Sequence, residues 1–266
     1  MRVLITGVSG MAGSILAELF LKSGHSVYGM VRHSATPNYW RIEHIRDKIQ
    51  LVMGDMADDT SLCHVVRAVQ PEITINCASQ SFVGASWSQP ELNIDITGIG
   101  VLRLLEAIRQ YAPKGCRFLQ FSSSEMFGNV LEIPQTEKTP LNPQSPYACA
   151  KILAHQMNIV YRRSYNMHNS SVICFNMEGN KRSDEFVTQK IAKGAARIRL
   201  SIDAGIEPEP LHLGNLKAKR DWSHAKDICR GAILAILHPE PGDWVLASGQ
   251  TRSVEEFCHY AFSAAD

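Results

Sequence analysis

Two residues with complementary acid–base chemistry stand four positions apart in the middle of the chain. Tyr147 and Lys151 fall in a segment rich in helix formers, Ala148 to Gln156, so one helical turn brings the phenol and the ammonium to the same face. The ammonium favours the phenolate and lowers the pKa of the phenol, which makes a proton acceptor usable near neutral pH. The Ser123 hydroxyl can hold a substrate oxygen against that phenol. The alternative is a tyrosine and a lysine on an ordinary surface helix.

A glycine-rich turn near the amino terminus gives this pair its context. A short apolar run from Arg2 to Thr6 predicts a buried strand, and the apolar positions from Ile15 to Phe20 recur at helical spacing. Between them the glycines are spaced G-x-x-G-x-x-G, the strand–turn–helix setting of a dinucleotide site. Helix amides and the helix dipole would face the phosphates. The turn residues expected to bind a dinucleotide are Gly7, Ser9, Gly10, Met11, Ala12 and Gly13.

The end of the second predicted strand, Ser26 to Val31, indicates which dinucleotide is bound. An NAD site usually carries Asp or Glu there to accept hydrogen bonds from the ribose, whereas this chain has Arg32 and, two residues on, Ser34. A cation with a neighbouring hydroxyl suits a 2′-phosphate. We therefore expect NADP, the alternative being a solvated arginine at a strand end.

Short apolar runs alternate with helical segments over the rest of the first 121 residues. Runs at 50–55, 72–77 and 117–121 are separated by helical patterns at 62–69 and 94–111. This alternation predicts an α/β fold with a doubly wound parallel sheet flanked by helices. Asp55 is expected on the adenine side of the cofactor, or simply as a turn former. The further cofactor-side candidates are Met56, Ala78, Ser79, Gln80 and Ser81.

Taken together, these motifs resemble the extended short-chain dehydrogenase/reductases, and within them the GDP-mannose 4,6-dehydratase family. The resemblance rests on the glycine turn, the Ser123-Ser124-Glu125 triplet and the Tyr147–Lys151 spacing. It covers nearly the whole chain and implies a Rossmann-like fold. The supporting stretches are Arg41–His44, Leu102–Ala107, Ser124–Gly128, Ile133–Glu137, Ser145–Tyr147, Phe186–Thr188, Leu213–Trp222 and His224–Asp227.

The resemblance also implies a mechanism in which water is removed from a nucleotide sugar. Tyr147 would take the proton of the sugar's 4-hydroxyl, while hydride passes to NADP and later returns to carbon 6. Lys151 would hold the cofactor ribose, and Ser123 stands where the family usually has threonine. Glu125 would remove the proton at carbon 5 and help water leave from carbon 6. The alternative for Glu125 is a strand-end carboxylate that caps the next turn.

By the same resemblance, the carboxyl-terminal part binds the sugar nucleotide, GDP-mannose or a relative. We expect residues 1–175 to form the NADP-binding domain, and residues 176–266 a sugar-nucleotide part interleaved with the last elements of the Rossmann core. Arg182 would lie near NADP. The expected substrate residues are Ser81, Ser123, Ser124, Glu125, Asn176, Val187, Lys190 and Arg220.

The sequence departs from the family pattern in this second part. A family loop reads here Asn176-Met-Glu-Gly-Asn-Lys-Arg182, without its histidine, its proline and one arginine, and Gln189 replaces another arginine. Ser201 to Glu209 looks like a longer loop than usual. The chain ends at Asp266, several tens of residues before family members do, which predicts a small, truncated substrate lobe.

Composition excludes several other classes of protein. The 266 residues are 45% apolar and 20% charged with a formal net charge of +1, so neither nucleic acid nor an anionic membrane is expected as a partner. Seven scattered cysteines indicate buried free thiols, and no Cys or His spacing resembles a metal site. Without a signal peptide or a long apolar run, a cytoplasmic enzyme is expected. By resemblance it forms a homodimer or homotetramer.

Two other functions remain open on the sequence. One is a reductase or epimerase acting on a related nucleotide sugar, which would have no need of the Glu125 carboxylate. The other is a non-catalytic relative that binds NADP and serves as a partner or regulatory subunit. The short carboxyl end and the altered 176–182 segment motivate the second alternative.

Overall fold

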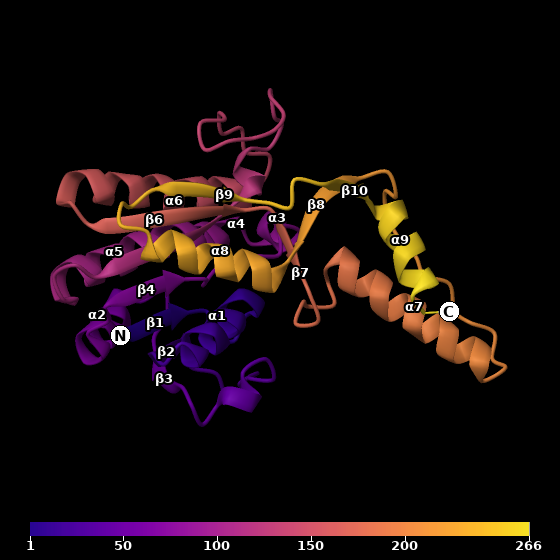
Figure 1. Cartoon of the computed structure of the whole chain (residues 1–266), viewed down its shortest axis with the longest axis horizontal. Helices are drawn as coiled ribbons and strands as arrows, with labels where there is room; N and C mark the ends of the chain where they lie inside the picture. The colour runs from indigo at the N-terminus through magenta and orange to yellow at the C-terminus, as the bar shows by residue number, and fades with distance from the viewer. Residues whose placement is uncertain (266) are drawn as a thin grey trace. The chain divides into compact units, whose positions relative to one another are not determined.

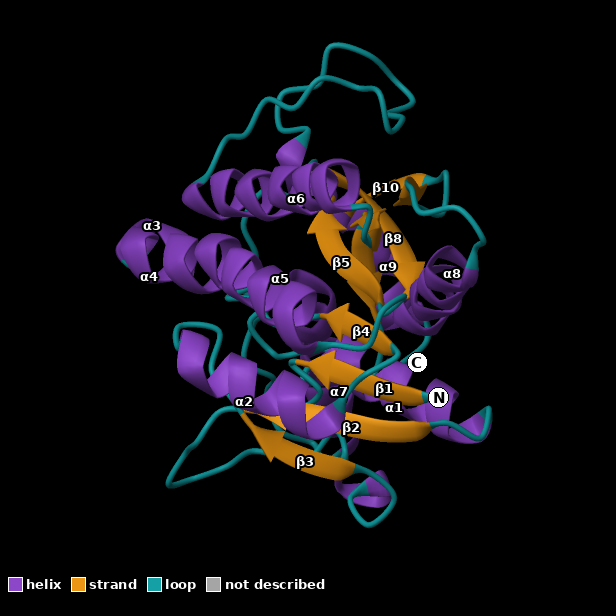
Figure 2. Cartoon of the chain, turned by 90° about the vertical axis from the view of Figure 1, so that its left-hand side faces the viewer, coloured by secondary structure: helices purple, strands orange, loops and turns teal. Residues whose placement is uncertain are grey.

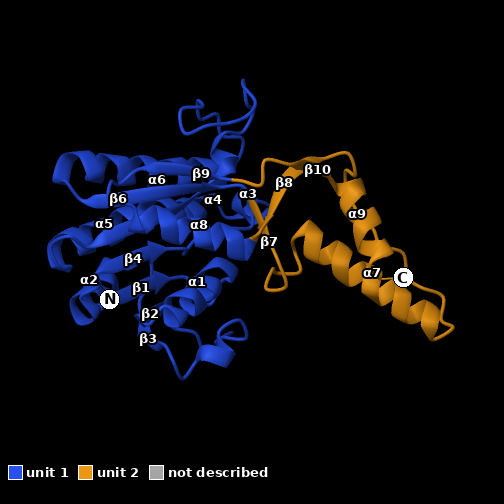
Figure 3. Cartoon of the chain, viewed as in Figure 1, with its two compact units in different colours: residues 1–175, 225–246 blue, residues 176–224, 247–266 orange. Residues whose placement is uncertain are grey.

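The computed structural model describes residues 1–265 (Figure 1). The chain divides into two compact units (Figure 3). The first contains Met1–Phe175 and Ala225–Leu246, and the second contains Asn176–His224 and Ala247–Asp266. The chain therefore leaves the first unit after Phe175 and returns to it for one helix and one strand.

The first unit is built on a seven-stranded sheet in the order β3-β2-β1-β4-β5-β6-β9. Every neighbouring pair is parallel, as the alternation of strands and helices predicted. In such a sheet both faces are covered and the strands are near-continuous apolar runs. Its strands are β1 (Arg2–Thr6), β2 (Ser26–Val31), β3 (Gln50–Met53), β4 (Ile73–Asn76), β5 (Arg117–Ser123), β6 (His168–Cys174) and β9 (Asp243–Leu246).

Helices cover both faces of this sheet, so the doubly wound prediction is confirmed. On one face α5 packs between α2 and α6, and on the other α1 packs against α8; Figure 2 shows α5 and α6 on one side of the sheet and α8 on the other. The helices of the unit are α1 (Met11–Lys22), α2 (Asp59–Val69), α3 (Ala85–Ser88), α4 (Pro90–Ile94), the π-helical turn η2 (Asp95–Ile99), α5 (Gly100–Tyr111), α6 (Pro146–Tyr165) and α8 (Ala225–Leu237), with short 3-10 turns η1 (Glu43–Ile45) and η3 (Ser124–Met126).

The core of the first unit lies where α2 and α5 press on the sheet. Leu62 and Val66 of α2, Leu104 and Leu105 of α5, and Phe118 of β5 are completely buried. Burying one such side chain stabilises the fold by about 1.5–3 kcal/mol. This apolar layer fixes the strands, and thereby the loops at their carboxyl ends.

The second unit has a three-stranded sheet in the order β10-β8-β7 and two helices that pack on each other. The segment 176–182 is not wholly a loop, since its first three residues pair with β8. Residues 201–203 belong to a helix, which ends before Gly205, where φ is +69°. The elements are β7 (Asn176–Glu178), α7 (Val187–Asp203), β8 (Lys219–His224), β10 (Thr251–Ser253) and α9 (Val254–Ser263).

All seven cysteines are free, as the sequence predicted, but they are not all buried. Cys116, Cys174 and Cys229 are buried, whereas Cys149 is exposed on α6. The helical periodicity there turns Cys149 away from the face that carries Tyr147 and Lys151. Among the described residues, none of the helices is both long and apolar enough to cross a membrane.

Candidate active site

The glycine turn between β1 and α1 is shaped by two close backbone approaches. Gly7 has φ +65°, a conformation that favours glycine, and its carbonyl accepts a hydrogen bond from the Gly10 amide at 2.9 Å. A side-chain carbon at Gly13 would collide with that same carbonyl oxygen. Only glycine at these positions lets the chain turn this tightly from strand into helix.

The first turn of α1 is open to an anion. Gly10 precedes the helix without a side-chain cap, and the first turn, which begins at Met11, contains no acidic residue. The first amides of a helix need an acceptor, and the helix dipole favours a negative one. The turn therefore fits the pyrophosphate of a dinucleotide.

The loop after β2 approaches this turn through an arginine that sequence reasoning did not select. Arg32 and Ser34 are exposed, and the Ser34 hydroxyl accepts from the Thr36 amide at 3.2 Å. Arg41 instead donates through Nη1 to the carbonyl of Ser9 at 3.4 Å. Arg41 lies in one of the stretches that resemble the family, but no spacing rule connects it with the glycine turn. The contact between Arg41 and Ser9 was therefore not predicted.

The other cofactor-side candidates lie at or after the carboxyl ends of β3 and β4. Asp55 accepts the Ala57 amide at 3.0 Å, which agrees with the turn-forming alternative. Met56 is buried, and Ser81 is exposed. The backbone amides of Ala78 and Gln80 donate to Thr6 Oγ1 at 3.2 Å and Thr97 Oγ1 at 3.1 Å. Ser79 lies between them, partly buried.

Helix α6 carries Tyr147 and Lys151 on one face. The helix begins with a proline, and the preceding Ser145 hydroxyl accepts the Ala148 amide at 3.1 Å, a regular amino-terminal cap. Tyr147 and Lys151 are both buried. Lys151 Nζ lies 5.8 Å from the centre of the Tyr147 ring and donates to the Phe121 carbonyl of β5 at 2.7 Å.

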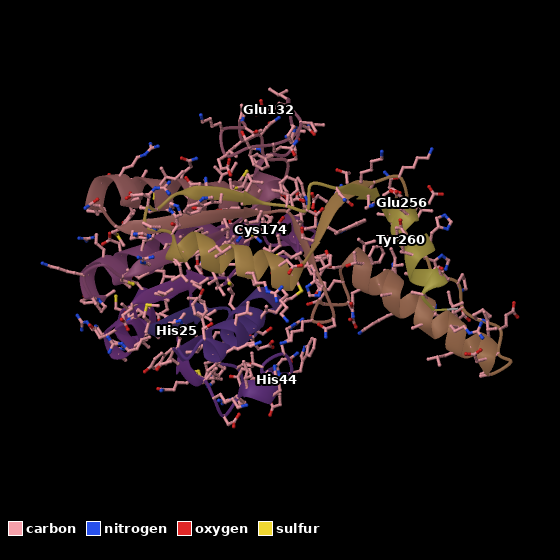
Figure 4. The ribbon with its side chains drawn as sticks, viewed as in Figure 1. His25, His44, Glu132, Cys174, Glu256 and Tyr260 are labelled. Atoms are coloured by element: carbon pink, nitrogen blue, oxygen red, sulfur yellow. The ribbon has the colours of Figure 1, made fainter. Side chains whose placement is uncertain are left out.

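Lys151 is surrounded by buried groups that carry no charge near neutral pH. Burial lowers its pKa to about 8, because the ammonium has lost its hydration. The titratable neighbours that act on it include the thiols of Cys77 and Cys174; Cys174 is labelled in Figure 4. Burial raises the pKa of Cys174 to about 12 and that of Cys77 further, so both thiols stay protonated. Lys151 therefore changes charge close to neutral pH.

Ser123 and Glu125 lie where β5 ends. Ser123 is the last residue of the strand, and its hydroxyl accepts the Glu125 amide at 3.2 Å to cap η3. Glu125 is partly exposed, and the turn that contains Ser124 and Glu125 packs against α6. The first unit thus brings this turn against the helix that carries Tyr147 and Lys151.

The expected substrate residues of the second unit are less buried than Tyr147 and Lys151. Asn176 pairs with Trp222 in the sheet, and Val187 is the first residue of α7. Lys190 is exposed in the first turn of that helix. Arg220 is exposed in β8 and donates through Nη1 to the neighbouring Lys219 carbonyl at 2.8 Å.

Arg182 has more side-chain contacts than these cations. Its Nε lies 3.3 Å from Glu178 Oε2, and its guanidinium stacks on the Phe186 ring at 3.3 Å. The Glu178 carboxylate also accepts from Thr188 Oγ1 at 2.5 Å, while burial raises its pKa. Glu178 thus holds the arginine in place, a role that sequence reasoning did not assign to it.

Nearly the whole chain is similar to known proteins of one family. A family model described as GDP-mannose 4,6 dehydratase matches residues 4–266. The GDP-mannose 4,6-dehydratase of Sinorhizobium fredii is 45% identical, over 97% of this chain and 75% of that protein. The human GDP-mannose 4,6 dehydratase is 40% identical, over 97% of this chain and 71% of its own length.

Solved structures agree on the fold. A UDP-glucose 4-epimerase of Thermus thermophilus in complex with NAD has a TM-score of 0.83 at 26% identity, covering 100% of this chain and 83% of its own. The dTDP-glucose 4,6-dehydratase DesIV of Streptomyces venezuelae, with NAD bound, has a TM-score of 0.85 at 23% identity, covering 100% and 82%. With the family model matching nearly every residue and relatives 40–45% identical, this chain belongs to the GDP-mannose 4,6-dehydratase family.

Proposed function

We propose that this protein is a lyase that removes water from GDP-mannose and forms GDP-4-keto-6-deoxymannose. Its membership of the dehydratase family supports the reaction class. The observation that carries the proposal further is the packing of η3, with Glu125, against α6, with Tyr147 and Lys151. A dehydratase needs a carboxylate beside a tyrosine–lysine pair, whereas a simple reductase or epimerase does not.

The residues of the first unit divide the proton transfers between them. Lys151 favours the Tyr147 phenolate by its charge, and the phenolate takes the proton of the sugar's 4-hydroxyl and becomes the phenol. The Ser123 hydroxyl holds the same sugar oxygen. Once carbon 4 is a ketone, the proton on carbon 5 is acidic, and the Glu125 carboxylate removes it and then assists the departure of the carbon 6 hydroxyl as water.

We infer that the dinucleotide is NADP. When bound, it supplies a reversible hydride acceptor, so the overall reaction needs no external oxidant. The glycine turn and the open amino terminus of α1 suit the pyrophosphate of NADP. Lys151 suits its ribose, and Arg32 with Ser34 suits its 2′-phosphate. The Thermus thermophilus epimerase structure contains NAD. Measuring the binding of NADP and NAD by isothermal titration calorimetry tests the choice: tighter NADP binding is expected, and equal affinity would contradict it.

The second unit is proposed to bind the nucleotide part of the substrate. Lys190 and Arg220 carry the charge that a diphosphate requires, and Asn176 and Val187 would line the same site. Ser81 and Ser124 are proposed on the sugar side. Arg182, held by Glu178, is proposed to contact the cofactor.

Assembly into a homodimer or homotetramer is also proposed. Apolar side chains are exposed along the helices of one face, at Leu92, Ile94, Ile99 and Val160. A second copy would cover such a surface. Light scattering after gel filtration gives the mass, and a monomer at micromolar concentration would contradict the proposal. A cytoplasmic location is proposed as well, to be checked by cell fractionation.

Incubating the purified protein with GDP-mannose and catalytic NADP tests the reaction. A dehydratase forms a 4-keto product, detected by mass as the loss of one water, with no net change in NADPH absorbance. Tyr147→Phe is the matched control, because it removes the proton acceptor and keeps the ring. Stoichiometric NADPH consumption on a keto sugar, with no loss of water from GDP-mannose, would contradict the proposal.

A further inference from the structure

A row of polar side chains crosses the parallel sheet at one level, beneath the candidate site. Thr6 of β1 pairs in register with Asn76 of β4, and Asn76 with Gln120 of β5. All three are buried. The interior strands of a parallel sheet are usually apolar, and a buried amide must satisfy its hydrogen bonds or cost about 1–3 kcal/mol. We call this row the amide ladder. The presence of these polar side chains in the interior of a parallel sheet therefore requires an explanation.

Each member of the amide ladder is oriented by the one before it. The Thr6 hydroxyl donates to Asn76 Oδ1 at 2.5 Å and accepts the Ala78 amide at 3.2 Å. Asn76 Nδ2 donates to Gln120 Oε1 at 2.9 Å. The Gln120 amide must then present its nitrogen on the other side, where it donates to the Phe121 carbonyl at 3.0 Å.

That carbonyl is also the acceptor of the lysine ammonium. Lys151 Nζ donates to it at 2.7 Å, so the Phe121 oxygen receives two donors, one for each lone pair. The ladder ends on the atom that holds the ammonium 5.8 Å from the Tyr147 ring. The titratable groups around Lys151 are Tyr147 on its own helix and the protonated thiols of Cys77 and Cys174 from the sheet. Hydrogen bonding to this carbonyl is thus a main way to fix the ammonium.

We propose that Gln120 is a positioning residue for the dehydration reaction, which fixes the Phe121 carbonyl and, through it, the Lys151 ammonium beside Tyr147. This inference rests on the roles proposed above for Tyr147 and Lys151. It adds a completely buried residue to the groups that support the reaction. The amide ladder also joins the glycine turn after β1 to the lysine, so both are held by one set of hydrogen bonds.

Two substitutions of different kinds test the role of Gln120. Gln120→Met keeps the size and removes the donor, so kcat should fall about ten- to a hundredfold, as expected for a small misplacement of a catalytic group, with KM for GDP-mannose nearly unchanged. Gln120→Glu keeps the shape and adds a carboxylate. Once ionised, it should move the alkaline limb of the pH profile of kcat/KM upward by about one unit or more.

The matched control is Ser171→Ala. Ser171 pairs with Gln120 at the same level of the sheet and is equally buried, but its hydroxyl accepts from Asn158 rather than contacting the lysine's carbonyl. The Ser171→Ala variant should be less stable than wild type and should keep the wild-type pH profile of kcat/KM. If Gln120→Met does not fold, the pH profile of Gln120→Glu tests the inference instead. A folded Gln120→Glu variant with the wild-type profile overturns the inference.

A substrate-free measurement separates this inference from the proposed function. The Tyr147 phenolate can be titrated by absorbance at 295 nm, using Tyr147→Phe as the blank. The amide ladder predicts that this titration shifts in both Gln120 variants and stays in place in Ser171→Ala. If wild type does not dehydrate GDP-mannose but the shift is found, the proposed function fails and the positioning role stands. If the titration is unchanged in both Gln120 variants, the positioning role fails.

Discussion

The two units of the molecule hold their candidate site residues in different ways. In the first unit Tyr147 and Lys151 are buried, and the lysine is fixed by a 2.7 Å hydrogen bond to a strand carbonyl. In the second unit Lys190 and Arg220 are exposed, and the Arg220 side chain donates to its neighbour's backbone. Chemical groups must be placed before the reaction begins, whereas charged binding groups can be ordered as the ligand arrives. This contrast supports the proposal that the reaction takes place in the first unit and that the second unit binds the substrate.

Removing the carboxylate should have the largest effect on turnover. Glu125→Gln keeps the side chain's size but removes its proton-accepting form, so we expect dehydration to slow by about 10²–10⁴-fold, the usual contribution of general acid–base catalysis. NADP affinity should change less than twofold. Steady-state assays and calorimetry measure both, and a variant with wild-type kcat would contradict the assignment of Glu125.

The buried lysine should cost stability. Its pKa is about 8 in the folded chain against an ordinary value of 10.5, so the unfolded chain binds the proton more tightly. That difference of about 2.5 units destabilises the folded state by up to about 3 kcal/mol below pH 8, and the penalty disappears as the pH rises towards 10.5. Lys151→Met should therefore raise the free energy of unfolding at pH 7, although it lowers activity.

Urea unfolding at pH 7 and pH 10 measures this effect of Lys151. The gain should be smaller at pH 10, where the wild-type lysine is already neutral in the fold. Lys190→Met is the control, since Lys190 is exposed and should leave unfolding unchanged. A loss of stability in Lys151→Met at pH 7 would mean that the ammonium is better satisfied than its burial indicates.

The cations of the second unit should affect affinity rather than turnover. Lys190→Ala and Arg220→Ala should each weaken GDP-mannose binding about tenfold, the value of one charge-assisted hydrogen bond of about 1.5 kcal/mol, with kcat nearly unchanged. Lys193→Ala, on the same helix and paired with Asp184 at 2.6 Å, is the control. A fall in kcat without a change in KM in Lys190→Ala or Arg220→Ala would contradict the proposed difference between the two units.

The smallest effects should come from the helix caps. Ser145 caps α6 in the first unit, and Ser253 caps α9 in the second through a capping box with Glu256. Each Ser→Ala change should cost about 1 kcal/mol. Ser253→Ala should increase amide exchange only in α9 and leave kcat unchanged, whereas Ser145→Ala loosens the turn that holds Tyr147 and should lower kcat. Equal effects of both changes on kcat would contradict the division of roles.

The parts of the fold that local sequence patterns control could be predicted. The glycine turn and the Tyr147–Lys151 face follow from spacings of fewer than ten residues. The parallel sheet follows from the alternation of short apolar runs and helical segments, and the fold class was confirmed. The family resemblance was confirmed by the comparisons. Residues 176–178 and 201–203 were wrongly expected in loops, because pairing with β8 and packing of α7 on α9 outweigh their weak local signals.

The amide ladder could not be predicted, because its members are far apart in sequence. Thr6, Asn76 and Gln120 are separated by 70 and 44 residues, and only the register of three parallel strands aligns them. Arg41 is another example, since its contact with Ser9 spans 32 residues. Each of these residues, seen alone in the sequence, is an ordinary polar side chain in or beside an apolar run.

Isotope transfer tests the central claim most directly, namely that one site carries out oxidation, proton removal and reduction on the same sugar. GDP-mannose with deuterium at carbon 4 is converted in ordinary water, and the product is read by NMR and mass spectrometry. The account predicts that the deuterium moves to carbon 6 of the same molecule in wild type, and that Glu125→Gln forms this product about 10²–10⁴-fold more slowly. Deuterium lost to solvent, or accumulated in the reduced cofactor in proportion to product, would contradict it.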